Sequence, residues 1–154
     1  MGGVEELPVT ETPAVNTLAT IGRRFAAWLL DGLVLTPVMA LLLALAGWDP
    51  GTGMDGVPQL SLSVFWVVLV AYHVGLVART GQTIGKRWMR IKVVDAITGA
   101  VPNLDQAGRR AAPVLVQIIP VLGALGPVLY VPALWRPRRQ GLHDRLAATV
   151  VVNV

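Results

Sequence analysis

The stretch Arg23-Arg24-Phe25-Ala26-Ala27-Trp28-Leu29-Leu30-Asp31 joins a basic pair to an apolar run that contains one carboxylate. From Phe25 to Ala46 the chain has 22 residues, and Asp31 is the only charged residue among them. A helix needs about 20 apolar residues to cross the hydrocarbon core of a bilayer. The stretch therefore predicts a transmembrane helix over about residues 24–46, with an acidic side chain inside it.

The acidic residue in this helix allows two interpretations. A carboxylate at the bilayer centre costs on the order of 2.5–3.5 kcal/mol, so it normally faces protein or water and has a partner. Arg24 lies seven residues before Asp31, which is about 10 Å along a helix and on nearly the same face. Asp31 is then either a proton- or cation-binding site with Arg24 as its counter-charge, or a hydrogen-bond acceptor that holds a neighbouring helix.

The composition is typical of a membrane protein with a single domain. Hydrophobic residues make up 54% of the 154 residues and charged residues 14%, against about 25% charged residues in a soluble domain. The net charge of +4 could indicate nucleic acid, but the basic residues lie beside apolar segments, where anionic lipid explains them. Without cysteine the chain can form no disulfide, cysteine-ligated metal site or thiol nucleophile.

Two further segments complete the first half of the chain. Residues 1–20 are acidic and lack apolar periodicity, and we interpret them as a disordered tail rather than a signal peptide. A second apolar run, Leu60–Ala78, predicts another transmembrane helix over residues 60–78. It contains His73, which we interpret as a hydrogen-bonded structural residue, with a proton-linked role as the alternative.

The basic residues are distributed unevenly around the second apolar run. The loop before it, Gly47–Pro58, contains two aspartates and no basic residue, whereas seven basic residues follow it between Arg79 and Arg110. Cytoplasmic loops carry the excess of lysine and arginine in membrane proteins. The segment 79–110 and the N-terminus are therefore predicted to be cytoplasmic.

The segment Gly81-Gln82-Thr83-Ile84-Gly85-Lys86-Arg87 has the look of a phosphate-binding loop but fails its pattern. That motif needs glycine where Thr80 stands and serine or threonine where Arg87 stands. We interpret the segment as a turn into a short interfacial helix. Lys86, Arg87 and Arg90 are then expected to meet anionic lipid headgroups.

The second half of the chain contains two strand-like runs and a third apolar region. Residues 90–95 and 148–154 are rich in β-branched side chains and are expected to pair, on one side of the membrane. Prolines at 113, 120, 127 and 132 and glycines at 123 and 126 interrupt the apolar region 111–135. One crossing there would put Arg136, Arg138, Arg139 and Arg145 outside, against the charge rule. We therefore favour a broken or re-entrant helix pair and a cytoplasmic C-terminus.

These elements predict the fold class. We expect an all-α integral membrane protein with a domain over residues 21–154 and two clear transmembrane helices. A Pro/Gly-broken third hydrophobic region over residues 104–135 forms either a third span or a helical hairpin, and a small β element lies in the cytoplasm.

Three motifs in order resemble the RDD family of small bacterial membrane proteins, named for one arginine and two aspartates. The pattern R-x-x-A-x-x-x-D is met by Arg24, Ala27 and Asp31, and G-Q-T-x-G-K-R is met by residues 81–87. The closing pattern R-R-Q-G-L-H-D-x-L-A-x-T-V-V is met by residues 138–151, with Asp144 as the second aspartate. Ala148 departs from the pattern, because glycine is common there, and the third apolar region is unusually rich in proline.

The resemblance implies a multi-spanning module of the bacterial inner membrane, with Arg24, Asp31 and Asp144 as the family positions. The usual suggestion is transport of an unidentified ligand, including cation/proton exchange, and association with larger membrane machinery is another. No catalytic triad, HExxH or metal-ligand cluster is present in the sequence, so we expect no enzyme, metal or cofactor. His143 adjoins Asp144, but consecutive helical residues do not face each other, so we do not interpret them as a dyad.

Two functions follow as hypotheses. In the first, the protein is transport-related, with an intramembrane Arg/Asp site that is linked to a proton, a cation or an unidentified ligand. In the second, it is a non-transporting accessory or assembly subunit, and the Arg and Asp residues are structural. The expected partners are membrane lipids and either further copies of the chain or a larger membrane complex.

Overall fold

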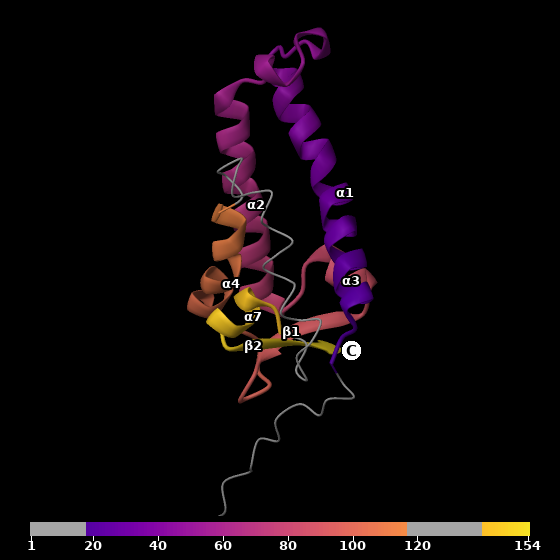
Figure 1. The fold of residues 1–154 in the computed structure, drawn as a ribbon, viewed down its shortest axis with the longest axis vertical. Helices are drawn as coiled ribbons and strands as arrows, with labels where there is room; N and C mark the ends of the chain where they lie inside the picture. Colours follow the sequence, from indigo (N-terminus) through magenta and orange to yellow (C-terminus); the bar gives the residue numbers. More distant parts are fainter. Residues whose placement is uncertain (1–17, 117–139) are drawn as a thin grey trace, which may run out of the picture.

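The computed structural model describes residues 18–116 and 140–154 of the chain. Its main feature is a pair of long helices that run side by side, α1 (Ile21–Leu45) and α2 (Gln59–Thr80) (Figure 1). Thr20 caps α1 by accepting a hydrogen bond from the backbone N–H of Arg23 at 3.3 Å. The left-handed residue Gly81, with φ of 74°, ends α2, as is common at helix C-termini.

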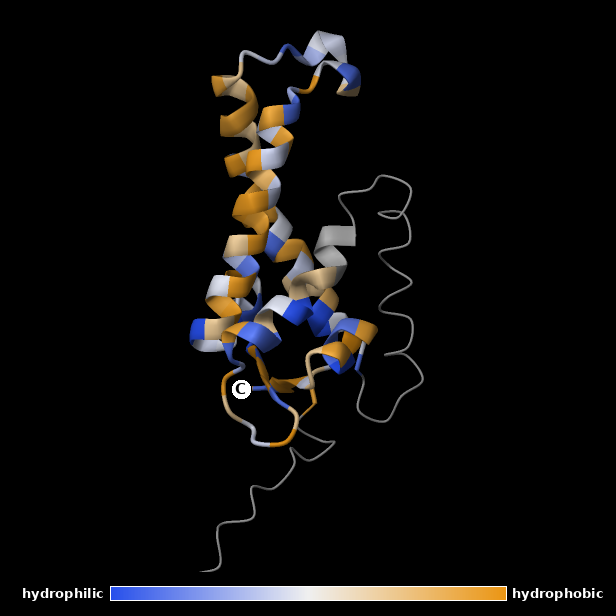
Figure 2. Cartoon of the chain, turned by 90° about the vertical axis from the view of Figure 1, so that its left-hand side faces the viewer, coloured by the Kyte–Doolittle hydropathy of each residue, from blue (hydrophilic) through white to orange (hydrophobic). Residues whose placement is uncertain are grey.

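Few side chains of these two helices are buried: Ala27, Asp31 and Leu35 in α1, and Ser61 and Val77 in α2. Leu33, Leu45 and Leu60 are 66%, 77% and 75% exposed, and the shafts of both helices are predominantly hydrophobic (Figure 2). Soluble monomers rarely expose apolar surface on this scale. Both helices are long and apolar enough to cross a membrane, which agrees with the two predicted transmembrane segments.

The remaining elements gather at the end of the pair where α1 begins and α2 ends (Figure 1). We call this group the cap; it consists of α3 (Ile84–Trp88), β1 (Ile91–Asp95), α4 (Leu104–Val116), α7 (Leu142–Leu146) and β2 (Thr149–Asn153). At the far end, the two helices are connected through the short 3-10 turns η2 (Pro50–Thr52) and η3 (Met54–Gly56).

The two strands pair with each other, as the sequence predicts. They form an antiparallel two-stranded sheet in which Val93 lies opposite Val151. An isolated bridge from Leu18 to Val152 extends the pairing to the residues before α1. Buried Ile91, Val93 and Val151 pack into a core that also includes Ala27 of α1 and Val77 of α2, so the sheet joins the cap to both long helices.

The predicted N-terminal tail and the predicted third apolar region compare differently with the structure. The tail predicted for residues 1–20 ends earlier, because Leu18 and Ala19 are buried against β2 and Thr20 caps α1. The remaining tail residues 1–17 lie outside the described residues. Of the third region predicted for residues 104–135, α4 accounts for Leu104–Val116; the rest, together with Arg136, Arg138 and Arg139, lies outside the described residues.

Candidate functional site

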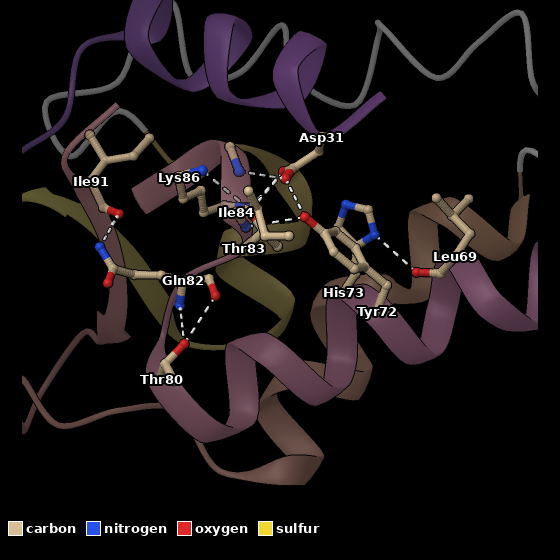
Figure 3. A network of polar contacts seen from close by, with 11 residues as sticks. Asp31, Leu69, Tyr72, His73, Thr80, Gln82, Thr83, Ile84, Lys86 and Ile91 are labelled. Carbon is tan, nitrogen blue, oxygen red and sulfur yellow. Dashed lines mark hydrogen bonds and ion pairs between the residues drawn. The ribbon is translucent and has the colours of Figure 1, made fainter. Parts of the chain in front are cut away.

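Asp31 lies on the face of α1 that packs against α3, and its side chain is almost completely enclosed. Its residue exposure is 2%. Oδ1 accepts hydrogen bonds from the Tyr72 hydroxyl at 2.7 Å and the backbone N–H of Gly85 at 2.8 Å. Oδ2 accepts one from the Thr83 hydroxyl at 2.6 Å (Figure 3). Donors from α2 and from the beginning of α3 thus converge on one carboxylate of α1.

The beginning of α3 is shaped to reach this carboxylate. Thr83 is the N-cap of α3, and its hydroxyl accepts from the backbone N–H of Lys86 while it donates to Asp31. At Gly85, a Cβ atom would lie 2.2 Å from the carbonyl oxygen of Ala27 and 2.9 Å from Asp31 Oδ1. Only glycine allows α3 to approach the backbone of α1 this closely.

Lys86 turns inward to the same site. Its Nζ lies 3.2 Å from Thr83 Oγ1 and 3.9 Å from Asp31 Oδ2, and 15% of its side chain is exposed. Burial and the nearby charge of Arg110 lower the pKa of Lys86 to about 8, although Asp31 and Asp144 act in the opposite direction. The prediction that Lys86 meets lipid headgroups is therefore wrong, because its amine lies beside the buried carboxylate of Asp31.

We call Asp31, Tyr72, Thr83, Gly85 and Lys86 the Asp31 cluster. His73 lies next to it and donates from Nδ1 to the carbonyl oxygen of Leu69 at 2.9 Å, since a carbonyl can only accept (Figure 3). This is the hydrogen bond that the structural interpretation of His73 expects; a proton-linked role stays a prediction.

The other polar residues predicted in this loop separate into two groups. Gln82 is structural, because its Nε2 donates to the carbonyl oxygen of Ile91 at 2.9 Å. Arg87 and Arg90 are exposed on the surface of the cap. Trp88, between them, is 65% exposed.

The second family aspartate, Asp144, forms a separate buried cluster at the start of α7. Arg24 Nη1 lies 3.1 Å from its Oδ2, and Arg110 forms an ion pair with its Oδ1. The backbone N–H of Gly141 donates to Oδ2 at 3.0 Å. Arg110 also donates to the hydroxyl of Thr149 at 2.8 Å, which ties α4 to β2. We call Arg24, Arg110, Gly141, His143, Asp144 and Thr149 the Asp144 cluster.

The expected pair of Arg24 with Asp31 is wrong. Among the described residues, the ion pairs connect Arg24 to Asp144 and Lys86 to Asp31. Arg24 and Asp31 are seven positions apart along α1, and each finds its opposite charge on another element. The expectation that His143 and Asp144 do not face each other also needs correction. In the short helix α7, His143 Nε2 lies 3.5 Å from Asp144 Oδ1.

Electrostatics in the Asp144 cluster favour an ionised carboxylate and a neutral imidazole. Burial alone would raise the pKa of Asp144, but Arg110, His143 and Arg24 hold it below its usual value. Burial lowers the pKa of His143 to about 4, against the attraction of Asp144 and with the help of Arg110 and Arg24. At neutral pH this arrangement is an arginine–carboxylate network beside a neutral imidazole.

A pocket of about 480 Å³ lies between the two long helices and reaches the Asp31 cluster. Its lining includes the polar residues Asp31, Thr36 and His73, and apolar side chains such as Leu35 and Phe65. In the described ranges 18–116 and 140–154, no group of three or more His, Cys, Asp or Glu side chains could hold a metal ion.

Sequence reasoning found the family residues but missed several of their partners. The sequence pattern does not single out three of these partners as site residues: Tyr72, Arg110 and Thr149. A signal existed for Tyr72, because a tyrosine hydroxyl inside an apolar run usually needs a hydrogen-bond partner. For Arg110 the signal was weaker: Arg109 beside it pairs with Asp105 on the exposed face, and one residue turns a helix by about 100°.

Comparison with known proteins agrees with the motifs. The model of the RDD family matches residues 18–148. An uncharacterized protein of Rickettsia prowazekii (strain Madrid E) is 33% identical over 87 residues, which cover 56% of this chain and 45% of the relative. The match thus spans less than half the length of that relative. No solved structure matches the chain significantly. The family match includes Arg24, Asp31 and Asp144 and covers most of the chain, so this protein belongs to the RDD family.

Proposed function

We propose that this protein is a non-transporting accessory or assembly subunit of a larger membrane complex, in which Asp31 and Asp144 fasten the cap to the membrane helices. One observation carries the proposal: donors of the protein itself occupy both oxygens of both carboxylates. Asp31 joins α1 to α2 and α3. Asp144 joins α7 to α1 and α4.

This occupancy argues against cation exchange at Asp31. A transported cation must replace ligands on a carboxylate oxygen each time it binds. Hydrogen bonds to a charged group contribute about 1.5–3 kcal/mol each, so displacing the Tyr72 and Thr83 hydroxyls would cost about 3–6 kcal/mol. The carboxylate already has its donors, since two hydroxyls, a backbone N–H and a lysine amine surround it.

The proposed location is the bacterial inner membrane, with the cap and both chain ends in the cytoplasm. The cap contains Arg87 and Arg90 on its surface, whereas the connection at the far end contains Asp49 and Asp55 and no basic residue. The positive-inside rule favours this orientation. Pairing of β1 with β2 supports it, because paired strands must lie on one side of the membrane.

The cap is also proposed to contact anionic lipid. From Trp28 to Leu45, α1 rises about 26 Å, close to the ~30 Å hydrocarbon core. Exposed Trp28 and Trp88 then lie at the cytoplasmic interface, where tryptophan is enriched. Arg87 and Arg90 flank Trp88 in the position for phosphate headgroups.

The pocket beside the Asp31 cluster favours a second candidate, proton- or cation-linked transport. His73 and Asp31 are among the residues that line this mainly apolar space between two membrane helices. In this alternative the Asp31 carboxylate loses a hydrogen-bond donor during the transport cycle. The state with all donors in place is then one of two states of the protein.

Reconstituted full-length protein distinguishes the two candidates. Vesicles with an internal pH dye would be given sodium or potassium gradients, with protein-free vesicles for reference. The proposal expects the same proton flux in both. A cation-driven flux that disappears in folded Asp31→Asn but persists in Asp55→Asn, which removes an exposed acid of the far loop, would establish transport instead.

A positive test of the accessory role uses the native membrane. Mild extraction followed by size separation should find the 16.4 kDa chain in a larger assembly. Co-expression of two differently tagged copies then identifies self-association, because only a homo-oligomer carries both tags. A chain that migrates as a lone monomer would contradict the accessory role.

A further inference from the structure

The two clusters adjoin each other and contain unequal numbers of charges. Lys86, Arg24 and Arg110 are basic, whereas Asp31 and Asp144 are acidic. The pKa of Lys86 responds to Arg110 and Asp144 as well as to Asp31, so the clusters act as one electrostatic unit. With His143 neutral, this unit has one positive charge in excess.

Lys86 is the member of the unit that can lose this charge. Arginine stays protonated in proteins, and each carboxylate is held by several donors. A lysine amine, in contrast, releases its proton readily when it is buried. The only polar contacts described for its Nζ are Thr83 at 3.2 Å and Asp31 at 3.9 Å.

Titratable groups of four other elements act on Lys86 or respond to it. They are Asp31 of α1, His73 of α2, Arg110 of α4, and His143 and Asp144 of α7. Asp31 and Asp144 favour the ammonium form, and Arg110 together with burial opposes it. The neighbours thus bring the charged and neutral forms of Lys86 close in free energy.

We infer that Lys86 is a binding site for one exchangeable proton, and that its occupancy sets the strength of the contact between α3 and α1. When the amine is protonated, it forms the ion pair with Asp31. When the proton leaves to water, the excess charge of the unit disappears, and Asp31 keeps its hydrogen bonds to Tyr72, Thr83 and Gly85. This goes beyond the structural role proposed above, which requires no change in the charge of Lys86.

The chain is well suited to a direct test, because Lys86 and Lys92 are its only two lysines. Full-length protein labelled with ¹⁵N at the lysine Nζ atoms would be titrated by NMR in lipid nanodiscs from pH 6 to pH 11. Lys92→Arg leaves a single Nζ signal, which belongs to Lys86. We expect its midpoint near pH 8, against about 10.4 for an unperturbed lysine.

Two outcomes would overturn the inference. The first is a midpoint near 10.4 for Lys86 in folded Lys92→Arg protein. The second is an unchanged midpoint in Asp31→Asn, because removal of the neighbouring negative charge must lower it; Asp55→Asn is the matched control and should leave it in place. If Lys86 titrates normally while the structural ion pairs are confirmed by stability measurements, this inference fails and the proposed function stands.

Discussion

Gly85→Ala tests the contact between α1 and α3 with a single methyl group. At Gly85 the new Cβ would lie 2.2 Å from the Ala27 carbonyl oxygen and 2.9 Å from Asp31 Oδ1. Carbon and oxygen need more than about 3 Å, and the first obstacle is helix backbone, which cannot rotate away. The substitution must therefore push α3 from α1 by about 1 Å.

The magnitude follows from the bonds that this displacement stretches. Gly85 N–H and the Thr83 hydroxyl donate to Asp31 at 2.8 and 2.6 Å. Charged hydrogen bonds contribute about 1.5–3 kcal/mol each, so losing both costs about 3–6 kcal/mol. Alanine recovers up to about 1 kcal/mol through its higher helix propensity. We expect a net loss of about 2–5 kcal/mol in the free energy of unfolding.

Reversible denaturation in mixed detergent micelles measures this loss. Gly22→Ala in α1 and Gly75→Ala in α2 are matched controls, because a Cβ at either position meets no described atom within 4 Å. The controls should be neutral or stabilising by up to about 1 kcal/mol. Equal stability of Gly85→Ala and Gly75→Ala would refute the close approach of α3 to Asp31.

Three further predictions concern charge, pH and topology. Asp31→Asn should destabilise the protein by about 1.5–3 kcal/mol in the same denaturation assay, because Lys86 loses its carboxylate; a neutral effect would contradict the ion pair. Lowering the pH from about 6.5 to 4 should reduce the free energy of unfolding by about 3 kcal/mol, since the unfolded chain binds a proton at His143 in this window while the folded chain does not. His143→Gln should remove this pH dependence. An unchanged pH profile in that variant would count against the role of His143. Reporter fusions at Val154 and Gly53 should report opposite sides of the membrane, with Val154 cytoplasmic; a periplasmic signal from Val154 would reverse the topology.

The sequence was sufficient for the elements whose length and periodicity are local properties. The run from Phe25 to Ala46 is long and apolar enough to predict α1, which spans Ile21–Leu45. The pairing of residues 91–95 with 149–153 followed from two β-branched runs in a small protein. Both arguments need only chain length and side-chain type.

The partners of the charged residues could not be predicted in this way. Lys86, Arg87 and Arg90 are equivalent basic residues in the sequence, yet only Lys86 turns toward Asp31, because Thr83 and Gly85 dock that face of α3 on α1. Arg24 has Asp144 as its partner 120 positions away. Such contacts depend on how separate elements pack, which residue spacing along one helix does not determine.

Double-mutant cycles on Arg24 test the account most directly. The central claim is that the two aspartates hold different elements, with Arg24 bonded to Asp144 rather than to Asp31. Free energies of unfolding would be measured for Arg24→Gln combined with Asp144→Asn and, separately, with Asp31→Asn. We predict a coupling energy of at least about 1 kcal/mol for the first pair and a smaller coupling energy for the second, because Arg24 contacts Asp144 directly. Coupling of Arg24 to Asp31 without coupling to Asp144 would contradict the account.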